Sequence, residues 1–381
     1  MVSALSNRHH YSSLDKGIYL NQASLGLVGQ PAVAAMQEFL ENIARHGNMY
    51  LTDDEEVELF APLRKSAAKL FNCPAEQLAI IGSAGEMLSQ LPYLFAPPAG
   101  GQILAIASDF PAITRPWSAF AADHGLSLVF IDEIRDQPIT ETLIDAINEN
   151  TSVILASYVQ FSTGSRLNCK KLRKAAQKVN ARLVIDVTQA AGAIPIDTSA
   201  WQADVIVCSG YKWLGGHGGV GLAVLAPELL EVTPPMPGWM GAPDPFDMQA
   251  TGLPLAPDAR RFTQSTMSYV SIVGLAVAIE ELLKLAPDKI VHHSKSLAQT
   301  LSRVLEGTGW EPYRELTDPS ASSHIITLGH ATAEADATLS SLLSSGITCS
   351  IRNGRVRVSL AHYNNSKDLE KLSDALKAIE C

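Results

Sequence analysis

The sequence predicts an α/β protein, with a large domain built on a mostly parallel β-sheet between helices and a smaller C-terminal α+β domain. Short apolar runs alternate with helical patterns through the first two-thirds of the chain, an order typical of layered α/β domains. The runs are almost continuously apolar, as expected for strands buried on both faces of a parallel sheet. Because 381 residues exceed the roughly 100–200 residues of a usual domain, we expect two domains.

The strands and helices of the large domain are expected to alternate after residue 100. We predict strands at residues 103–107, 126–131, 153–158, 183–187, 205–209 and 220–225. Helical patterns lie between them, for example at residues 111–124, 141–149 and 169–179. This order indicates strand–helix units that build a largely parallel sheet.

A segment rich in Pro, Gly and Asp separates the two expected domains. Residues 233–257 are predicted to form an ordered loop. Beyond it we expect long helices near 271–285 and 291–306, a strand at 324–328, a helix at 337–343, strands near 347–351 and 356–360, and a last helix at 366–379. We therefore divide the chain into an N-terminal arm (1–18), a large domain (19–257), and a helical connection with the small domain (258–381).

The composition argues against several classes of protein. The 29 Lys and Arg residues are outnumbered by 39 Asp and Glu residues, giving a formal net charge of −10, so we expect no nucleic-acid partner. No apolar stretch approaches the roughly 18 residues of a membrane span, and the first residues lack a signal-peptide block. Five scattered cysteines without a Cys-x-x-Cys pair indicate neither a disulfide framework nor a zinc site: Cys73, Cys169, Cys208, Cys349 and Cys381. These observations predict a cytoplasmic enzyme that acts on small molecules.

Two charged residues follow successive predicted strands, at the edge where parallel sheets bind ligands. Asp186 ends an apolar run, where a carboxylate is unfavourable without a partner; alone, it could equally cap the next helix. Lys212 follows the next strand, and alone it would be interpreted as a surface residue. Together they match the needs of pyridoxal phosphate, whose aldehyde requires an amine and whose ring nitrogen requires a carboxylate.

The sequence resembles the class V aminotransferases, the fold-type I pyridoxal-phosphate enzymes that include cysteine desulfurases, kynureninases and isopenicillin N epimerases. The resemblance extends from YLNQASLG at Tyr19 to HYNNSKDLEKL near the C-terminus. It implies the fold-type I fold, pyridoxal 5′-phosphate as cofactor, an amino-acid substrate, and a homodimer with shared active sites.

The resemblance assigns roles to residues around the two strand ends. Lys212 is similar to the lysine that forms the Schiff base and then acts as general base, and Asp186 to the partner of the pyridinium nitrogen. Gln189, in a D-x-x-Q motif, is expected to bond the 3′-oxygen of the cofactor. Ser209 resembles a phosphate ligand, and Tyr211 occupies a position where many members carry His.

Three further segments resemble parts of the cofactor site. In IIGSAGEMLSQL, the N–H groups of Gly85 and Glu86 are expected to bind the phosphate at a helix N-terminus, the alternative being an ordinary turn capped by Ser83. Phe110, in SDFPAITRPW, is expected to stack on the pyridine ring, with core packing as the alternative. Gln160, in SYVQFSTGSR, is expected to face the cofactor oxygen or the substrate.

The C-terminal motif R-x-S-x-x-x-Y-N resembles the site of the substrate carboxylate. Arg357 would hold the α-carboxylate with its planar guanidinium, whereas Arg352 and Arg355 are interpreted as charged residues on the face of a strand. Thr266, in RRFTQSTMSY, is expected to contact the phosphate of the neighbouring subunit, which implies the homodimer.

Two other motifs are not interpreted as sites. The sequence GHGGVG at residues 216–221 runs into a strand rather than a helix, so it does not indicate a dinucleotide fold. The pair His292 and His293 lies in a helical pattern and is predicted to face solvent.

The reaction that follows proton removal at the substrate Cα is less constrained. β-Elimination, transamination, decarboxylation coupled to deamination, and epimerisation all remain open. Cysteine desulfurases carry a nucleophilic Cys on a loop shortly before the R-x-S motif, whereas Cys349 is expected within a strand, which disfavours persulfide chemistry. The narrow prediction is C–S β-elimination from a cysteine conjugate. A non-catalytic regulatory protein that kept the fold is the rival, and the joint presence of Lys212, Asp186, Gln189 and Arg357 argues against it.

Overall fold

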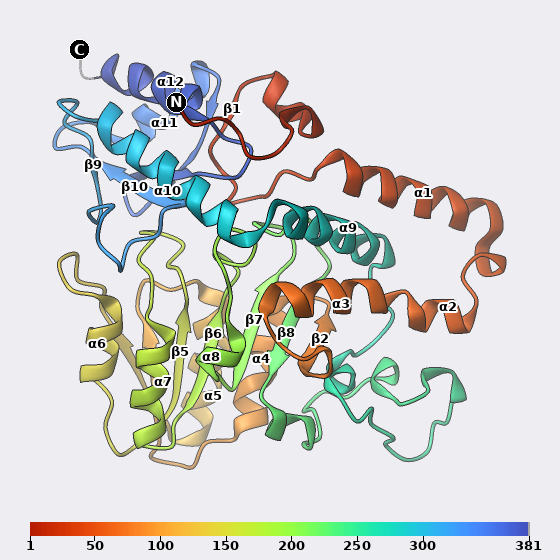
Figure 1. Cartoon of the computed structure of the whole chain (residues 1–381). Helices are drawn as coiled ribbons and strands as arrows, with labels where there is room; N and C mark the ends of the chain where they lie inside the picture. Colours follow the sequence, from red (N-terminus) through yellow and green to blue (C-terminus); the bar gives the residue numbers. More distant parts are fainter. Residues whose placement is uncertain (380–381) are drawn as a thin grey trace.

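A computed structural model of the chain describes residues 1–379, with a seven-stranded sheet at its centre (Figure 1). The strand order is β2-β8-β7-β6-β5-β3-β4; β8 runs antiparallel to β2 and β7, and the other neighbours are parallel. The strands are β2 (Leu78–Ile81), β3 (Gln102–Ile106), β4 (Ser127–Ile131), β5 (Thr151–Ser157), β6 (Arg182–Asp186), β7 (Val205–Ser209) and β8 (Gly221–Leu225). The predicted, mostly parallel sheet is confirmed, and its six predicted strands shift by two residues at most.

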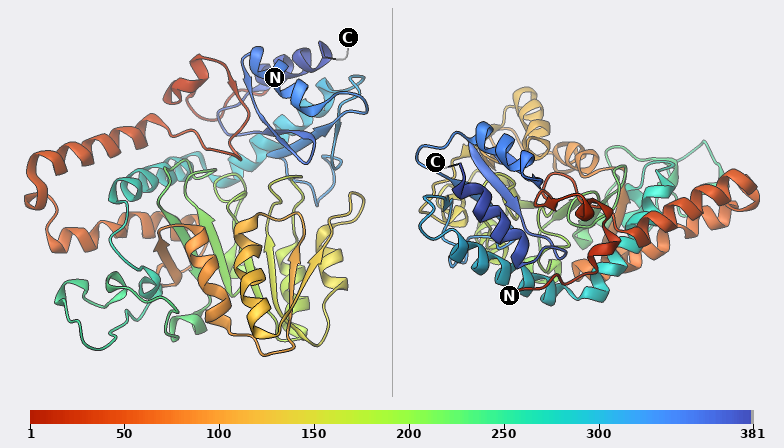
Figure 2. Two further views of the ribbon diagram at one scale, coloured as in Figure 1. Left: turned by 180° about the vertical axis from the view of Figure 1, so that it is seen from behind. Right: turned by 90° about the horizontal axis from the view of Figure 1, so that it is seen from above.

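Helices cover both faces of this sheet. On one face, α4 (Ala84–Phe95) and α5 (Pro111–His124) pack around the buried Trp117 (Figure 2). The other face is covered by α3 (Phe60–Phe71), α6 (Ile139–Asp145), α7 (Cys169–Lys178), α8 (Thr198–Trp201) and α9 (Tyr269–Leu285). Because both faces are buried, the central strands carry apolar residues continuously.

A smaller sheet lies above the carboxyl ends of the large one (Figure 1). Its order is β12-β13-β10-β9, formed by β9 (Glu311–Pro312), β10 (Ile325–Gly329), β12 (Ser350–Arg352) and β13 (Arg355–Ser359). The helices of this unit are α10 (Pro287–Val304), α11 (Ala335–Ser344) and α12 (Ser366–Lys377). The N-terminal strand β1 (Ile18–Tyr19) pairs with β11 (Ile347–Thr348), so it contributes to the small unit, whereas the predicted division assigned residues from 19 onward to the large domain.

The N-terminal part of the chain contains helices that were not predicted. α1 (Gln30–His46) packs against α9, and with α2 (Asp53–Glu58) it projects to one side of the molecule (Figures 1 and 2).

Short 3-10 helices occur along the chain, at Arg8–His10, Ser12–Asp15, Gly47–Met49, Ala75–Gln77, Pro227–Leu230, Trp239–Gly241, Pro245–Asp247 and Ala259–Phe262. Two of them lie within the predicted loop at 233–257.

One prediction about a helix face is wrong. His292 is exposed, but His293 is buried, and its Nε2 lies 3.1 Å from the carbonyl oxygen of Asn364. The reason is helical spacing: His293 lies three residues after the buried Ile290 and four before the buried Leu297, on the face of α10 that packs inward.

Two further expectations concern the cysteines and the membrane. Cys73, Cys169, Cys208 and Cys349 are free thiols, and Cys381 lies outside the described residues. Within residues 1–379, no helix is both long and apolar enough to cross a membrane.

A buried ion pair joins the two units. The Arg314 and Glu133 side chains are each 3% exposed, with 3.8 Å between Nη2 and Oε1. Arg314 also donates to Ser165 Oγ at 2.6 Å and to the carbonyl oxygens of Ile134 and Gln137. The segment between β9 and β10 is thus fixed to the loop after β4.

Removal of this cation is expected to destabilise the protein. Arg314→Ala leaves the Glu133 carboxylate buried without its partner, a change that typically costs about 3–5 kcal/mol. The midpoint of urea unfolding should fall accordingly. Arg135→Ala is the control, because Arg135 contacts the same segment through a side chain that is 46% exposed, and we expect a loss of at most about 1 kcal/mol. Equal effects of the two variants would contradict the role of the buried pair.

Candidate active site

An amine and a carboxylate meet where β6 and β7 end. Asp186 is the last residue of β6, and Lys212 lies in the turn after the neighbouring parallel strand β7. Both side chains are buried. Burial lowers the pKa of Lys212 to about 8; the Asp186 carboxylate opposes this shift, and the Arg357 cation adds to it. Burial raises the pKa of Asp186, partly offset by hydrogen bonds from Thr188 and by Lys212.

The Lys212 turn is held by residues from both ends of the chain. Gln22 donates from Nε2 to the carbonyl oxygen of Lys212 at 2.9 Å, and its Oε1 accepts from the Tyr363 hydroxyl at 2.7 Å. A Cβ atom on Gly26 would lie 2.0 Å from the same Lys212 oxygen, so only glycine fits there. The YLNQASLG segment therefore packs directly against the backbone of the lysine.

Phe110 lies beside the amine rather than in the core. Its ring is 40% exposed, and the Lys212 Nζ lies 5.2 Å from the ring centroid. Phe161 contacts it edge to face at 5.5 Å between centroids. The alternative of core packing is therefore wrong, whereas stacking of Phe110 on the pyridine ring stays a prediction.

A second buried carboxylate, Asp109, was missed by the sequence reasoning. It accepts hydrogen bonds from the Phe110 N–H, from the N–H and hydroxyl of Ser157, and from Gln160 Nε2. Burial raises its pKa to about 6, and the nearby Asp186 adds to the shift. Asp109 follows β3 closely, so the strand-end rule that found Asp186 could also have found it.

The predicted phosphate site lies at the N-terminus of α4. The Glu86 N–H donates to Ser83 Oγ at 3.0 Å, and Glu86 Oε2 accepts from the Gly82 N–H at 3.0 Å. The helix is thus capped by Ser83, as in the alternative interpretation. A Cβ atom on Gly85 would meet nothing closer than Ser83 Oγ at 3.7 Å, so open space faces this helix end. Phosphate binding by Gly85 and Glu86 stays a prediction.

The other predicted cofactor ligands lie around the same turn. Ser209, the last residue of β7, donates its N–H to Thr188 Oγ1 at 3.0 Å, and the Tyr211 ring centroid lies 5.8 Å from Lys212 Nζ. Gln189 donates to the Ala23 carbonyl oxygen at 3.0 Å and accepts from Trp213 Nε1 at 2.8 Å. Its amino group carries two N–H bonds, and the predicted contact with the 3′-oxygen requires the second.

Thr266 does not join this group within one subunit. It is exposed on the loop before α9, beside Tyr269, which accepts a hydrogen bond from it. This position is compatible with the predicted contact across a dimer, which stays a prediction.

Two arginines converge on one serine. Arg357 is 1% exposed and donates from Nη1 to the Phe161 carbonyl oxygen at 2.8 Å and from Nη2 to Ser24 Oγ. Arg352 also donates to Ser24 Oγ, at 3.4 Å. Burial and the adjacent Arg352 lower the pKa of Arg357 to about 9. Within the described residues no carboxylate forms an ion pair with either arginine, so the site offers two guanidinium groups to an anion.

Arg352 lies on a strand as predicted, at the end of β12, but its side chain also reaches Ser24 beside Arg357. Arg355 lies outside this group, with its guanidinium carbon 5.4 Å from the Tyr313 ring centroid. Arg352 lies opposite Arg355 in the register of β12 and β13, and it meets Arg357 at Ser24, a residue 328 positions away along the chain, so sequence reasoning missed this contact.

The residues present fit pyridoxal phosphate. A buried amine with a lowered pKa faces a buried carboxylate at neighbouring strand ends, as the aldehyde and the ring nitrogen require. In the described part of the chain, the buried Gln160 Oε1 and Arg357 Nε have no hydrogen-bond partner, which leaves an acceptor and a donor for a ligand. Open space beyond Gly85 lies at a helix N-terminus, where a phosphate is favoured.

A family model described as class-V aminotransferase matches residues 18–372. The chain belongs to the class-V aminotransferase family. Its predicted family, fold and cofactor, and its nature as a pyridoxal-phosphate-dependent enzyme, are thereby confirmed.

Individual relatives are distant in sequence but similar along most of the chain. An uncharacterized aminotransferase of Bacillus subtilis is 23% identical, over 97% of this chain and 96% of that protein. A probable cysteine desulfurase of Streptomyces coelicolor is 26% identical, over 76% of this chain and 72% of the relative. A solved complex of a cystine C–S lyase with its reaction product cysteine persulfide has a TM-score of 0.86 at 18% identity, covering 97% of this chain and 99% of that chain.

Attachment of the cofactor to Lys212 is expected to depend on pH. Only the neutral amine attacks an aldehyde, so the attachment rate should rise with pH through a midpoint near 8. Arg352→Gln removes one positive charge that lowers the pKa of Lys212, so the midpoint should move upward. The measurement is the rate at which cofactor-free protein develops the visible absorbance of the bound cofactor. Arg355→Gln, beside Tyr313, is the control, and a shift of equal size in this variant would contradict the charge effect.

Proposed function

We propose that the protein is a pyridoxal-phosphate-dependent C–S lyase that cleaves cysteine conjugates by β-elimination. The observation that carries this proposal is a site with the buried Lys212 amine and the buried Arg357 guanidinium, in which the nearby thiol of Cys349 is itself buried. Cys349 lies between β11 and β12, is 5% exposed, and has its pKa raised to about 12 by burial. A thiolate at this residue is disfavoured, which supports departure of the sulfur together with its own substituent.

Lys212 is the proposed base. With a pKa near 8, a useful fraction of its amine is neutral around neutral pH, and a base is most effective when its pKa lies near the working pH. Pyridoxal phosphate, when bound, supplies the electron sink that makes the substrate Cα–H acidic. Lys212 Nζ accepts the Cα proton, the Cβ–S bond breaks, and the sulfur departs as a thiolate with the bonding electrons. Hydrolysis of the remaining fragment gives pyruvate and ammonia.

Arg357 is the proposed anchor of the substrate α-carboxylate. Its guanidinium is fixed by the Phe161 carbonyl oxygen and by Ser24, and burial strengthens its attraction for an anion. Asp186 would hold the ring nitrogen of the cofactor, and Phe110 would cover the ring face. A substrate carboxylate at Arg357 is thereby held close to Lys212, whose pKa that arginine already lowers.

The relatives support elimination at sulfur. The solved cystine C–S lyase shares the fold over nearly the whole chain, and one curated relative is a probable cysteine desulfurase. Both names describe reactions at the sulfur of a cysteine derivative. Their low identity leaves the identity of the conjugate to experiment.

We also propose that the enzyme is a homodimer in the cytoplasm. The projecting helix α1 and the segment after it expose Leu40 and Met49, which are 52% and 83% accessible in the single chain. Thr266 is exposed on the loop predicted to reach the partner's phosphate. Exposed apolar side chains on a projecting segment favour burial against a second copy.

Turnover is expected to release pyruvate and ammonia from S-substituted cysteines. Lys212→Ala should lower the rate by about 10²–10⁴-fold, because it removes the base, while circular dichroism shows a retained fold. Borohydride should reduce the holoenzyme to a stable adduct at Lys212. Several conjugates without pyruvate release, together with turnover that needs a keto-acid acceptor, would move the assignment to transamination. A colourless protein without an adduct would support the non-catalytic rival.

Cys349 is expected to be dispensable. Cys349→Ser preserves the size of a buried side chain and removes the thiol, so release of pyruvate from a conjugate should continue at the unmodified rate. Arg357→Lys provides the comparison, because a lysine cannot form the two parallel hydrogen bonds to a carboxylate and the KM should rise. Loss of turnover in a folded Cys349→Ser protein would instead indicate persulfide chemistry.

A further inference from the structure

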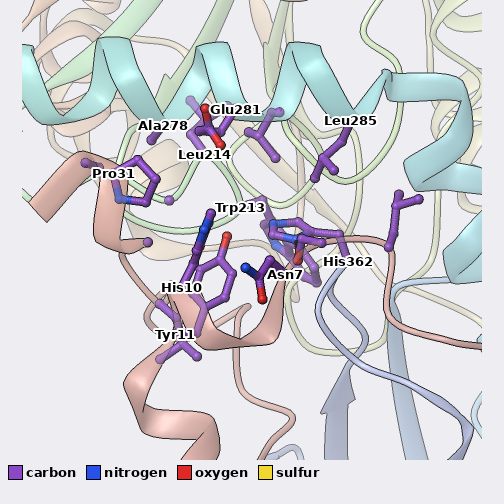
Figure 3. Close-up of a pocket in the computed structure, with 17 residues that line it drawn as sticks. Asn7, His10, Tyr11, Pro31, Trp213, Leu214, Ala278, Glu281, Leu285 and His362 are labelled. Atoms are coloured by element: carbon purple, nitrogen blue, oxygen red, sulfur yellow. Dashed lines mark hydrogen bonds between the residues drawn. The ribbon is translucent and has the colours of Figure 1, made fainter.

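A second cavity lies behind the Lys212 turn. It has a volume of about 130 Å³ and is enclosed by the N-terminal arm, the start of α1, α9, the residues after Lys212, and His362. Figure 3 shows Ala278, Glu281 and Leu285 on the helix at one side, with Tyr11 and His362 opposite. A dry cavity of about 150 Å³ is known to admit benzene, so this space suits a ligand of about one ring.

The lining combines apolar and aromatic surface with one acid. Leucine, proline and alanine side chains form much of the wall, and Tyr11 and Trp213 add aromatic surface. Glu281 is the only acidic residue in the lining, which contains neither lysine nor arginine. His362 does not oppose a cation, because burial lowers its pKa to about 4 and keeps the imidazole neutral.

The Glu281 carboxylate is available to the cavity. It lines the cavity from α9, and Figure 3 shows it on the side opposite Tyr11. One carboxylate oxygen accepts from Lys284 Nζ at 2.7 Å, but these side chains are 37% and 70% exposed, and such surface pairs contribute little. A carboxylate accepts at both oxygens, so a cation in the cavity can share it with Lys284.

We propose that this cavity is a binding site for a small organic ammonium ion with an apolar body of about one ring. The carboxylate of Glu281 would balance the charge, and Tyr11 and Trp213 would contact the cation through their aromatic surfaces. The leucines would cover the apolar body and remove it from water, which favours binding.

Such a ligand would also contact the catalytic turn. Trp213 follows Lys212 directly, and its Nε1 donates to Gln189 Oε1. The Gly215 N–H donates to the Lys212 carbonyl oxygen at 3.1 Å. The same turn forms a wall of both sites. Binding of the ligand and protonation of Lys212 are therefore coupled, and each affects the other equally. This step rests on the proposed function of Lys212, whereas the binding site does not.

The binding test uses N,N-dimethylbenzylammonium and the cofactor-loaded protein. A tertiary amine cannot form a Schiff base, so it does not react with the cofactor at Lys212. Isothermal calorimetry should show saturable binding at one site per chain, with much weaker binding of the neutral benzyl methyl ether. Glu281→Gln should weaken binding of the cation about tenfold or more, because hydrogen bonds to charged groups are worth about 1.5–3 kcal/mol.

Two variants complete the test. Glu280→Gln is the matched control, since Glu280 is the exposed neighbour on the same helix, and binding should not change. Ala278→Phe should fill the cavity and abolish binding of the probe.

The proposed site would be overturned by the absence of saturable heat, or by heat that Glu281→Gln and Ala278→Phe leave unchanged. Because heat is measured without turnover, this result is independent of whether any conjugate is cleaved. An unchanged pH midpoint for cofactor attachment in the presence of bound probe would overturn the coupling to Lys212.

Discussion

The burial of the Lys212 amine at the end of β7 is the constraint on which the rest of the site depends. An ammonium removed from water is destabilised, and this sets its pKa near 8 rather than 10.5. Asp186 offsets part of the penalty from the neighbouring strand end, and Arg357 adds to it from the small unit. The parallel pairing of β6 and β7 fixes the position of Asp186 relative to Lys212. The docking of the small sheet fixes the position of Arg357 relative to Lys212.

That docking uses both ends of the chain. β1 pairs with β11, and an isolated bridge joins Asn21 to Ser359, so the N-terminal segment is held by the small sheet as it passes the Lys212 turn. Gln22 then bonds the lysine carbonyl and the Tyr363 hydroxyl together. On the opposite side, the buried pair of Arg314 and Glu133 fixes the segment before β10 to the large unit. Arg357 is consequently positioned by contacts made far from it.

The limits of prediction from sequence follow from the same contacts. Asp186 and Lys212 could be found because a charged residue at the end of an apolar run is conspicuous along the chain itself. Arg352 could not, since it meets Arg357 at Ser24, a residue 328 positions away along the chain. Gln22 gave no signal either, because its role lies in packing between residues hundreds of positions apart. His293 shows the related difficulty of assigning a helix face before its partner helix is known.

Burial also separates the chemistry that this site favours from the chemistry that it disfavours. A low-dielectric environment stabilises the neutral form of a titratable group relative to its charged form. Lys212 therefore loses its proton more readily, which makes it a better base near neutral pH. The thiol of Cys349 keeps its proton, which makes it a poor nucleophile. Arg357 is buried and Arg352 is partly buried, and in the described part of the chain neither forms an ion pair with a carboxylate, although the whole chain carries a formal charge of −10. These properties support the proposed binding of a carboxylate and removal of a proton from the carbon beside it, and they disfavour a thiolate that takes sulfur from the substrate.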